Sequence, residues 1–194
     1  MSFNNKNNNN SKEEEDDELK PIIETERLYL RHIIFKDIDA MFLLYSDPDV
    51  MNIIGGQEVR ISKEQVIEDI KKIREQYSTN DCIGRLAVIK KDIGTNEFIG
   101  WTGLKNENNV NNHDKFIDLG YRLIKKYWNY GYATEACIAC IKYGFNVKKF
   151  DKICAYVLEN NQSSINVLQK CGFIKIETFI SEDGNEIWFE IIRP

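Results

Sequence analysis

The sequence predicts one mixed α/β domain preceded by a short polar segment. Apolar residues recur at three- and four-residue steps in some segments and at every second position in others, which indicates amphipathic helices and half-buried strands. Their order is a start that resembles two strands, then two helices, three strands, a helix, a strand, a helix and two strands. With 42% hydrophobic and 29% charged residues among 194, the chain can bury a substantial core.

Residues 1–20 differ in composition from the rest of the chain. An asparagine-rich run and an acidic run leave almost nothing to bury, so we expect a disordered tail here and a folded domain over residues 21–194. The tail contributes −3 of the net charge of −5. The near-neutral remainder argues against a nucleic-acid partner. No apolar run could span a membrane and no secretory signal is visible, so we expect no membrane partner and a cytoplasmic location.

The five cysteines are odd in number and scattered, which favours free thiols in a reducing compartment. Cys137 and Cys140 form a Cys-x-x-Cys pattern, but on the apolar face of an expected helix. We therefore interpret them as core residues rather than as a redox or metal pair. With His32 and His113 as the only histidines, a zinc site is hard to assemble, and no metal is expected.

Two helices are expected in the first half of the chain. The apolar face of residues 38–45 indicates one, which stops before Pro48 because a residue before proline avoids the helical conformation. Ser62 followed by Gln65 is a capping-box pattern that starts the other. The expected elements are a strand within 22–34, a helix at 38–45, a loop at 49–60, a helix at 63–77, strands at 85–90 and 98–104, and an exposed loop at 106–114. In that last loop, His113 is expected to be solvated.

Residues 116–145 form the centre of the expected fold. Alternate residues from Ile117 to Leu123 line one face of a strand, and a loop at 125–130 leads through Gly131 into a helix. A strand that feeds a helix through a tight turn directs backbone N–H groups at one place, which favours an anion. Geometry alone leaves two interpretations open, a phosphate cradle and an ordinary strand–helix unit.

The last quarter of the chain continues the alternation of strands and helices. We expect a strand at 152–158, a helix from about Ser164 to Cys171 that ends at Gly172, and strands at 174–180 and 186–193 around a turn at 182–185.

Three stretches carry recognisable signatures. They are Glu24-Thr25-Glu26-Arg27-Leu28-Tyr29-Leu30-Arg31, the run from Gly120-Tyr121 to Tyr132-Ala133-Thr134-Glu135-Ala136, and the run from Asn161 through Ser164 to Gly172-Phe173. Together they resemble the GNAT acyl-CoA-dependent N-acetyltransferases, and more closely the Rim-type branch, which is similar to ribosomal-protein N-terminal acetyltransferases. The resemblance covers residues 22–193. It implies a GNAT fold, in which a mostly antiparallel twisted sheet splays at the cofactor site beside about four helices.

The resemblance implies acetyl-CoA as co-substrate. Pantetheine would lie in the gap beside the central strand, and the diphosphate on the loop before the central helix. The implied cofactor-binding residues are Tyr121, Arg122, Leu123, Lys126, Asn129, Tyr130, Gly131, Tyr132, Ala133, Thr134 and Asn161. Two positions depart from the family pattern, since Lys126 replaces an arginine or glutamine and Asn129 replaces a glycine. Asparagine is the non-glycine residue that best tolerates a left-handed backbone, so we expect the loop to survive.

Four residues are candidates for catalysis. The amide of Leu123 is the expected oxyanion donor, because a fixed backbone dipole needs no reorganisation during reaction. The resemblance implies that Ser164 donates a proton to the leaving thiolate, and the alternative is a helix N-cap. For the general base we consider Asp118 and Glu182, and the alternative for each is an ordinary surface carboxylate.

The expected reaction is acetyl transfer to a primary amine, most readily a peptide or protein N-terminal α-amine. The pKa of such an amine, about 7.7–8.0, leaves a sizeable neutral fraction near pH 7, whereas a lysine-like amine needs a stronger base. Three alternatives stay open: a small-molecule amine acetyltransferase, a catalytically silent acyl-CoA-binding module, and an assembly module. The sequence predicts no oligomeric state.

Overall fold

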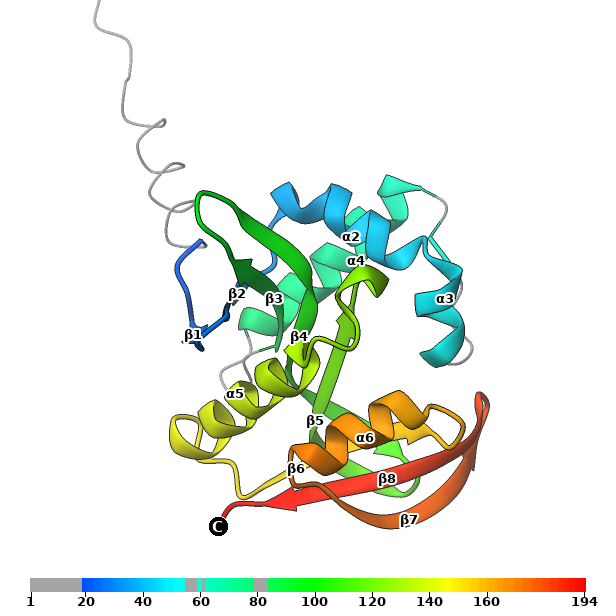
Figure 1. Cartoon of the computed structure of the whole chain (residues 1–194). Coiled ribbons are helices and arrows are strands. Elements are labelled where there is room, and N and C mark those ends of the chain that lie inside the picture. Colours follow the sequence, from blue (N-terminus) through cyan, green and yellow to red (C-terminus); the bar gives the residue numbers. More distant parts are fainter. Residues whose placement is uncertain (1–18, 55–58, 61, 79–83) are drawn as a thin grey trace, which may run out of the picture.

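The computed structural model describes residues 19–54, 59–60, 62–78 and 84–194. Within these ranges one sheet of eight strands runs in the order β1-β2-β3-β4-β5-β6-β8-β7 (Figure 1). Neighbouring strands are antiparallel except for β5 and β6, which are parallel. The predicted mixed α/β fold with a mostly antiparallel sheet is confirmed.

The strands are β1 (Ile23–Glu24), β2 (Leu28–His32), β3 (Gly84–Lys91), β4 (Asn96–Val110), β5 (His113–Leu123), β6 (Lys152–Leu158), β7 (Ile174–Ser181) and β8 (Gly184–Ile192). The described α-helices are α2 (Ile38–Tyr45), α3 (Pro48–Met51), α4 (Lys63–Glu75), α5 (Tyr132–Asn146) and α6 (Gln162–Lys170). Short 3-10 turns include η2 (Asn52–Ile54) and η4 (Lys125–Tyr127). None of these helices combines the length and the apolar character that crossing a membrane requires.

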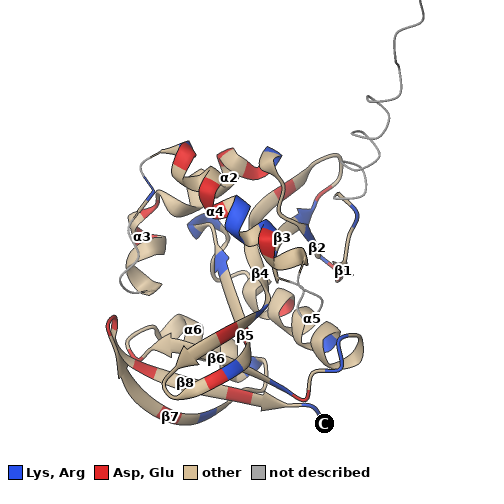
Figure 2. Ribbon diagram, turned by 180° about the vertical axis from the view of Figure 1, so that it is seen from behind, with Lys and Arg blue, Asp and Glu red and all other residues tan. Residues whose placement is uncertain are grey.

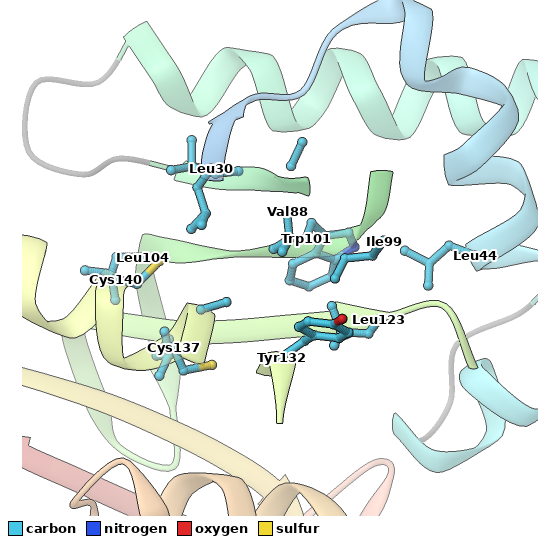
Figure 3. Close-up of a cluster of buried hydrophobic side chains, with 14 of the residues drawn as sticks. Leu30, Leu44, Val88, Ile99, Trp101, Leu104, Leu123, Tyr132, Cys137 and Cys140 are labelled. Atoms are coloured by element: carbon cyan, nitrogen blue, oxygen red, sulfur yellow. The ribbon is translucent and has the colours of Figure 1, made fainter. Parts of the chain in front are cut away.

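The helices lie against different parts of the sheet. Helices α2 and α4 pack together beside β3 and β4, whereas α5 packs against β4 and β5 and touches α6 (Figure 1). The apolar core joins the sheet to α2, α4 and α5, and Cys137 and Cys140 lie within it among Leu104 and its neighbours (Figure 3). Both thiols are fully buried, and burial raises the pKa of Cys140 to about 12. Core packing is therefore the role of this Cys-x-x-Cys pattern, and the described residues contain no cluster that could hold a metal ion.

Several local predictions are confirmed by hydrogen bonds. Ser62 Oγ accepts from the N–H of Gln65 at 3.4 Å, and Gln65 Oε1 accepts from the N–H of Ser62 at 3.2 Å, which completes the capping box of α4. Helix α6 ends as expected, because Gly172 follows its C-cap with a left-handed φ of 91°.

The prediction of a loop at residues 49–60 is wrong for residues 49–54, which form a short helix and a 3-10 turn. Asp47 caps α3 by accepting a hydrogen bond from the N–H of Asp49 at 2.9 Å, and Pro48 occupies the first turn. The 3-10 turn η2 follows directly. The asparagine, glycine and missing periodicity of this stretch concealed a short helix that two local signals, a cap and a proline, would have indicated. Gly55-Gly56 and most of the expected tail lie outside the described residues.

The exposed loop expected at 106–114 is also wrong, because β4 and β5 extend through it as a long hairpin. The asparagines of its tip supply left-handed residues for the turn, at Asn111 (φ 46°) and Asn112 (φ 64°). The imidazole of His113 stacks on Trp188 with ring centres 4.0 Å apart, so this side chain is partly buried rather than solvated. Polar composition predicted a loop, but antiparallel pairing of the consecutive strands β4 and β5 decided the structure.

Candidate active site

The parallel strands β5 and β6 separate after a single pairing. Asp118 pairs with Cys154, and beyond this point β5 stays with β4 while β6 stays with β8. The gap is a cleft of about 210 Å³. Its lining includes Tyr121, Tyr156, Asn161, Ser164, Leu168 and Glu186. The structure therefore brings together the central strand and the signature that begins at Asn161, which lie some forty residues apart in the sequence.

The backbone of Leu123 faces this gap. Ile124 donates its N–H to Ile99 O at 2.9 Å, so these two residues form a hydrogen-bonded pair of the β4–β5 ladder. In an antiparallel ladder such pairs alternate with pairs whose polar groups point away from the partner strand. Leu123 and Gly100 are the next pair. The N–H and C=O of Leu123 therefore point away from β4, and its C=O accepts from the indole N–H of Trp128 at 2.8 Å.

The loop before α5 has the conformation that the sequence predicted. Asn129 and Gly131 both adopt left-handed backbone angles, with φ of 66° and 80°. Helix α5 begins without a side-chain cap, so the amides of its first turn are left for another acceptor. An added Cβ on Gly131 would meet only Arg27, at 3.6 Å, so close packing does not require a glycine here. The glycine instead permits the left-handed backbone angle and leaves the nearby backbone amides accessible. The arrangement fits an anion at the helix N-terminus.

A brace that the sequence analysis did not assign holds this loop to the first strands. Glu135 accepts hydrogen bonds from Thr25 Oγ1 at 2.6 Å and from Arg27 Nε at 2.7 Å. Arg27 also donates to Tyr130 O at 3.0 Å and lies 4.6 Å from the ring centre of Tyr132. Thr25, Arg27 and Glu135, which belong to the quoted signatures, thus form one contact. The presence of these polar residues in two signatures far apart in the sequence was a signal from which the contact could have been predicted.

Other predicted loop residues lie at its margins. Lys126 pairs with Glu97 at 2.7 Å, and this ion pair raises the pKa of Lys126 to about 12. Its charge is therefore held beside β4, and a phosphate contact by Lys126 stays a prediction. Tyr130 is exposed, whereas Ala133 and Thr134 lie in the first turn of α5. Their backbone amides are the groups available to a ligand.

Asn161 rather than Ser164 caps α6. Asn161 Oδ1 accepts from the N–H of Ser164 at 3.1 Å, and its Nδ2 donates to Ile53 O at 2.9 Å. The N-cap interpretation of Ser164 is therefore wrong, because this serine is the third residue of the helix. Its side chain lines the cleft, and its C=O accepts from the hydroxyl of Tyr121 at 3.4 Å. A cofactor contact by Asn161 stays a prediction, since both ends of its side chain are engaged within the protein.

Asp118 lies at the cleft but is bound by a cation. Its buried carboxylate forms an ion pair with Arg85, which also donates to Asp118 O at 3.1 Å. Gly120, two residues further along β5, makes room for this guanidinium, because an added Cβ would lie 2.6 Å from it. A carboxylate that is already bound to a guanidinium is not free to take up the proton of an amine. The predicted role of Asp118 as base thus receives no support from its surroundings.

Glu186 is the buried one of two acidic residues that line the cleft and that the sequence analysis missed; the other, Asp183, is exposed. Predicted Glu182 lies in the exposed turn between β7 and β8, while Glu186, on β8, is 6% exposed and lines the cleft. Burial raises the pKa of the Glu186 carboxyl above its usual value, and the hydrogen bond from Ser181 at 2.6 Å offsets this only in part. Its Oε2 is buried without a partner among the described residues. No local pattern marks Glu186, since its burial depends on β6 and the β7–β8 hairpin.

Comparison with known proteins identifies this arrangement. The chain matches the family described as acetyltransferase (GNAT) domain over residues 27–174. It is similar to an uncharacterized N-acetyltransferase of Bacillus subtilis (strain 168), YoaA, with 32% identity over 180 residues that cover 90% of this chain and 98% of the relative. Among solved structures it is similar to an acetyltransferase (GNAT family) from Bacillus anthracis, with a TM-score of 0.72, 28% identity, and coverage of 88% and 98%. It also shares its fold with spermidine N-acetyltransferase from Vibrio cholerae in complex with CoA and spermine, with a TM-score of 0.70, 17% identity, and coverage of 87% and 97%.

Proposed function

The chain belongs to the GNAT acetyltransferase family and is an N-acetyltransferase, and from this premise we propose that it acetylates the α-amine at a peptide or protein N-terminus. One observation carries the transfer reaction: β5 lines the cleft and then leads through a short loop into the uncapped N-terminus of α5. The choice of acceptor is supported by the Rim-type signatures and by the pKa of an α-amine, about 7.7–8.0, which leaves it partly neutral near pH 7. The spermidine acetyltransferase shares only the fold, and its acceptor is no guide here.

The residues present fit acetyl-CoA, which the family uses as acetyl donor. The left-handed residues Asn129 and Gly131 and the free amides that follow them suit a diphosphate. The unpaired edge of β5 at Tyr121 and Leu123 suits an extended amide chain, which would complete the interrupted ladder. By the same alternation, the backbone of Arg122 faces β4, so this residue would contribute to the site through its side chain rather than its backbone.

We assign three roles to side chains and amides at the cleft. Glu186 accepts the proton of the acceptor amine, directly or through water, because its pKa lies above that of an ordinary carboxyl group. The N–H of Leu123 stabilises the carbonyl oxygen that becomes negative during transfer. Ser164 supplies a proton to the leaving thiolate, because its hydroxyl is not used as a helix cap.

The test is a competition between acceptor classes. Peptides with free N-termini, spermidine and Nα-acetyl-lysine are mixed at equal concentration with acetyl-CoA, and the products are identified by mass spectrometry. We expect the peptide α-amine to be acetylated fastest. Preferential acetylation of spermidine would overturn the peptide assignment. CoA binding without thiol release from any acceptor would favour the second candidate, a catalytically silent acyl-CoA-binding module.

A further inference from the structure

A second pocket, of about 480 Å³, opens on the other side of β5 and joins the cleft. Both are lined by Ile54, Leu119, Gly120 and Tyr156, so a molecule in the pocket can reach the point where the strands separate. The side chains of Tyr121 and Arg122, consecutive residues of β5, point to the two opposite sides of this strand. The hydroxyl of Tyr121 donates to α6, whereas Arg122 reaches Met51 of α3 and the ring of Tyr45 on α2. The pocket is therefore a place for the acceptor, on the side opposite α6.

The charges that line this pocket are unbalanced. Five basic residues face two acidic ones, and they are Arg60, Lys72, Arg85, Lys105 and Arg122 against Asp69 and Asp118. Three of the cations have carboxylate partners, because Arg60 pairs with Asp69, Arg85 with Asp118, and Lys105 with Glu107. Figure 2 shows acidic and basic residues interspersed along the visible ribbon.

Two of the five cations, Lys72 and Arg122, have no ion pair with a carboxylate among the described residues, and of these Lys72 is exposed whereas Arg122 is partly buried. Its contacts are one weak acceptor, Met51 Sδ at 3.4 Å, and two aromatic rings, those of Tyr45 at 5.0 Å and Trp101 at 5.3 Å. Its Nε is buried and has no acceptor within the described part of the chain. Burial lowers the pKa of Arg122, and the charges of Arg85 and Arg60 add to this effect, whereas Tyr45 and Asp69 offset part of it. A partly buried guanidinium without an anion is costly, and a ligand that brings a carboxylate removes the cost.

We propose that the acceptor of this acetyltransferase carries a carboxylate close to its amine, and that Arg122 binds that carboxylate. This inference rests on the proposed acetyl transfer. The planar guanidinium, held between two aromatic rings, can receive a carboxylate through two parallel hydrogen bonds. The same positive charge repels polyamines. Two sources offer the required chemistry: a peptide that begins with an acidic residue, and a free amino acid.

Two matched pairs of acceptors separate these sources. The first is a pair of C-terminally amidated tripeptides that differ only in starting with Glu or Gln, and the second is free alanine against alaninamide. In each pair one member lacks the carboxylate. With the wild-type protein we expect the carboxylate-bearing member of one pair to have a kcat/KM higher by about tenfold or more, because charge-assisted hydrogen bonds are strong. The pair that shows the preference identifies the source.

The variant Arg122→Gln removes the guanidinium, and Arg193→Gln is the matched control. Arg193 is exposed, pairs with Asp151, and lies outside both pockets. We expect the preference to fall to near parity in Arg122→Gln and to persist in Arg193→Gln. We also expect the Tm of Arg122→Gln to be no lower than that of the wild type, because an unpaired buried charge is removed. Equal rates within both pairs for the wild type, or a preference that survives in Arg122→Gln, would overturn the proposal.

Binding of glutarate, a dicarboxylate without an amine, tests the site separately from the reaction. We expect glutarate to raise the Tm of the wild type and of Arg193→Gln but not of Arg122→Gln. If glutarate does so while no amine is acetylated, the anion site stands and the proposed function fails. If amines are acetylated without a carboxylate preference, the proposed function stands and this inference fails. If neither effect is seen, both are overturned.

Discussion

Replacing Glu186 by glutamine separates a catalytic carboxylate from a structural one. The side chain is 6% exposed, Oε1 accepts from Ser181 at 2.6 Å, and Oε2 has no partner among the described residues. Glutamine keeps the shape and can keep the hydrogen bond from Ser181, but it cannot accept a proton from an ammonium group. Activity and stability should therefore change in opposite directions.

The magnitudes follow from the two roles. Loss of a general base should lower kcat by about 10²- to 10⁴-fold. Removing a buried charge that is only half satisfied should raise the free energy of unfolding by about 1 kcal/mol near neutral pH. For a domain of this size that corresponds to a rise in Tm of about 2–4 °C. Because the folded pKa of Glu186 is raised, the carboxyl group favours folding at low pH and loses this contribution as the pH rises through the folded pKa. The stability gain of the variant should thus vanish in acid.

Steady-state thiol release from acetyl-CoA, measured from about pH 5 to pH 9, gives the rates, and thermal unfolding at the same pH values gives the stability. Wild-type kcat should fall on the acid side as Glu186 becomes protonated, and this fall should be absent in Glu186→Gln. Glu182→Gln is the control, since it makes the same chemical change in the exposed turn nearby. A kcat of Glu186→Gln equal to that of the wild type, or a larger loss of kcat in Glu182→Gln than in Glu186→Gln, would refute the assignment.

Three further outcomes are expected. Gly131→Val should weaken CoA binding by about tenfold or more, because a side chain would obstruct the backbone amides. Gly172→Val is the control, because it introduces a similar left-handed strain outside the loop. It should leave CoA affinity unchanged in the same calorimetric titration, and an equal loss of CoA affinity in both variants would contradict the phosphate-loop assignment. Ser164→Ala should lower kcat by about 10²-fold without lowering Tm, since this serine caps no helix, and normal turnover would remove its role as proton donor. In Glu135, partial burial raises the pKa, but hydrogen bonds from the first strands, including Arg27, outweigh it and lower the pKa. Its contribution to stability is therefore present above the unfolded pKa and lost as the pH falls through the folded pKa. Denaturant unfolding of Glu135→Gln should show a free energy of unfolding lower than that of the wild type by about 1 kcal/mol at pH 7, and this difference should shrink below about pH 4. A difference that stays constant with pH would contradict the brace.

Local chemistry allowed the sequence to predict the loop before α5 and most element boundaries. A left-handed residue is inexpensive only for glycine and, next, asparagine, so Asn129 and Gly131 marked a turn by themselves. The capping box of Ser62 and Gln65 likewise lies within one helical turn. Local rules also failed in places, since the asparagines at 106–114 belong to a hairpin.

The chemical state of the side chains at the cleft was decided by the tertiary structure alone. Asp118 and Glu186 look alike in the sequence, but a guanidinium from β3 neutralises the first while burial beside β6 raises the pKa of the second. Arg122 is one arginine among many until α2 and α3 enclose it without a carboxylate. A carboxyl group or a guanidinium acquires its function from desolvation and from the charges near it. Both depend on residues tens of positions away in the chain, and only the folded structure brings these residues within reach.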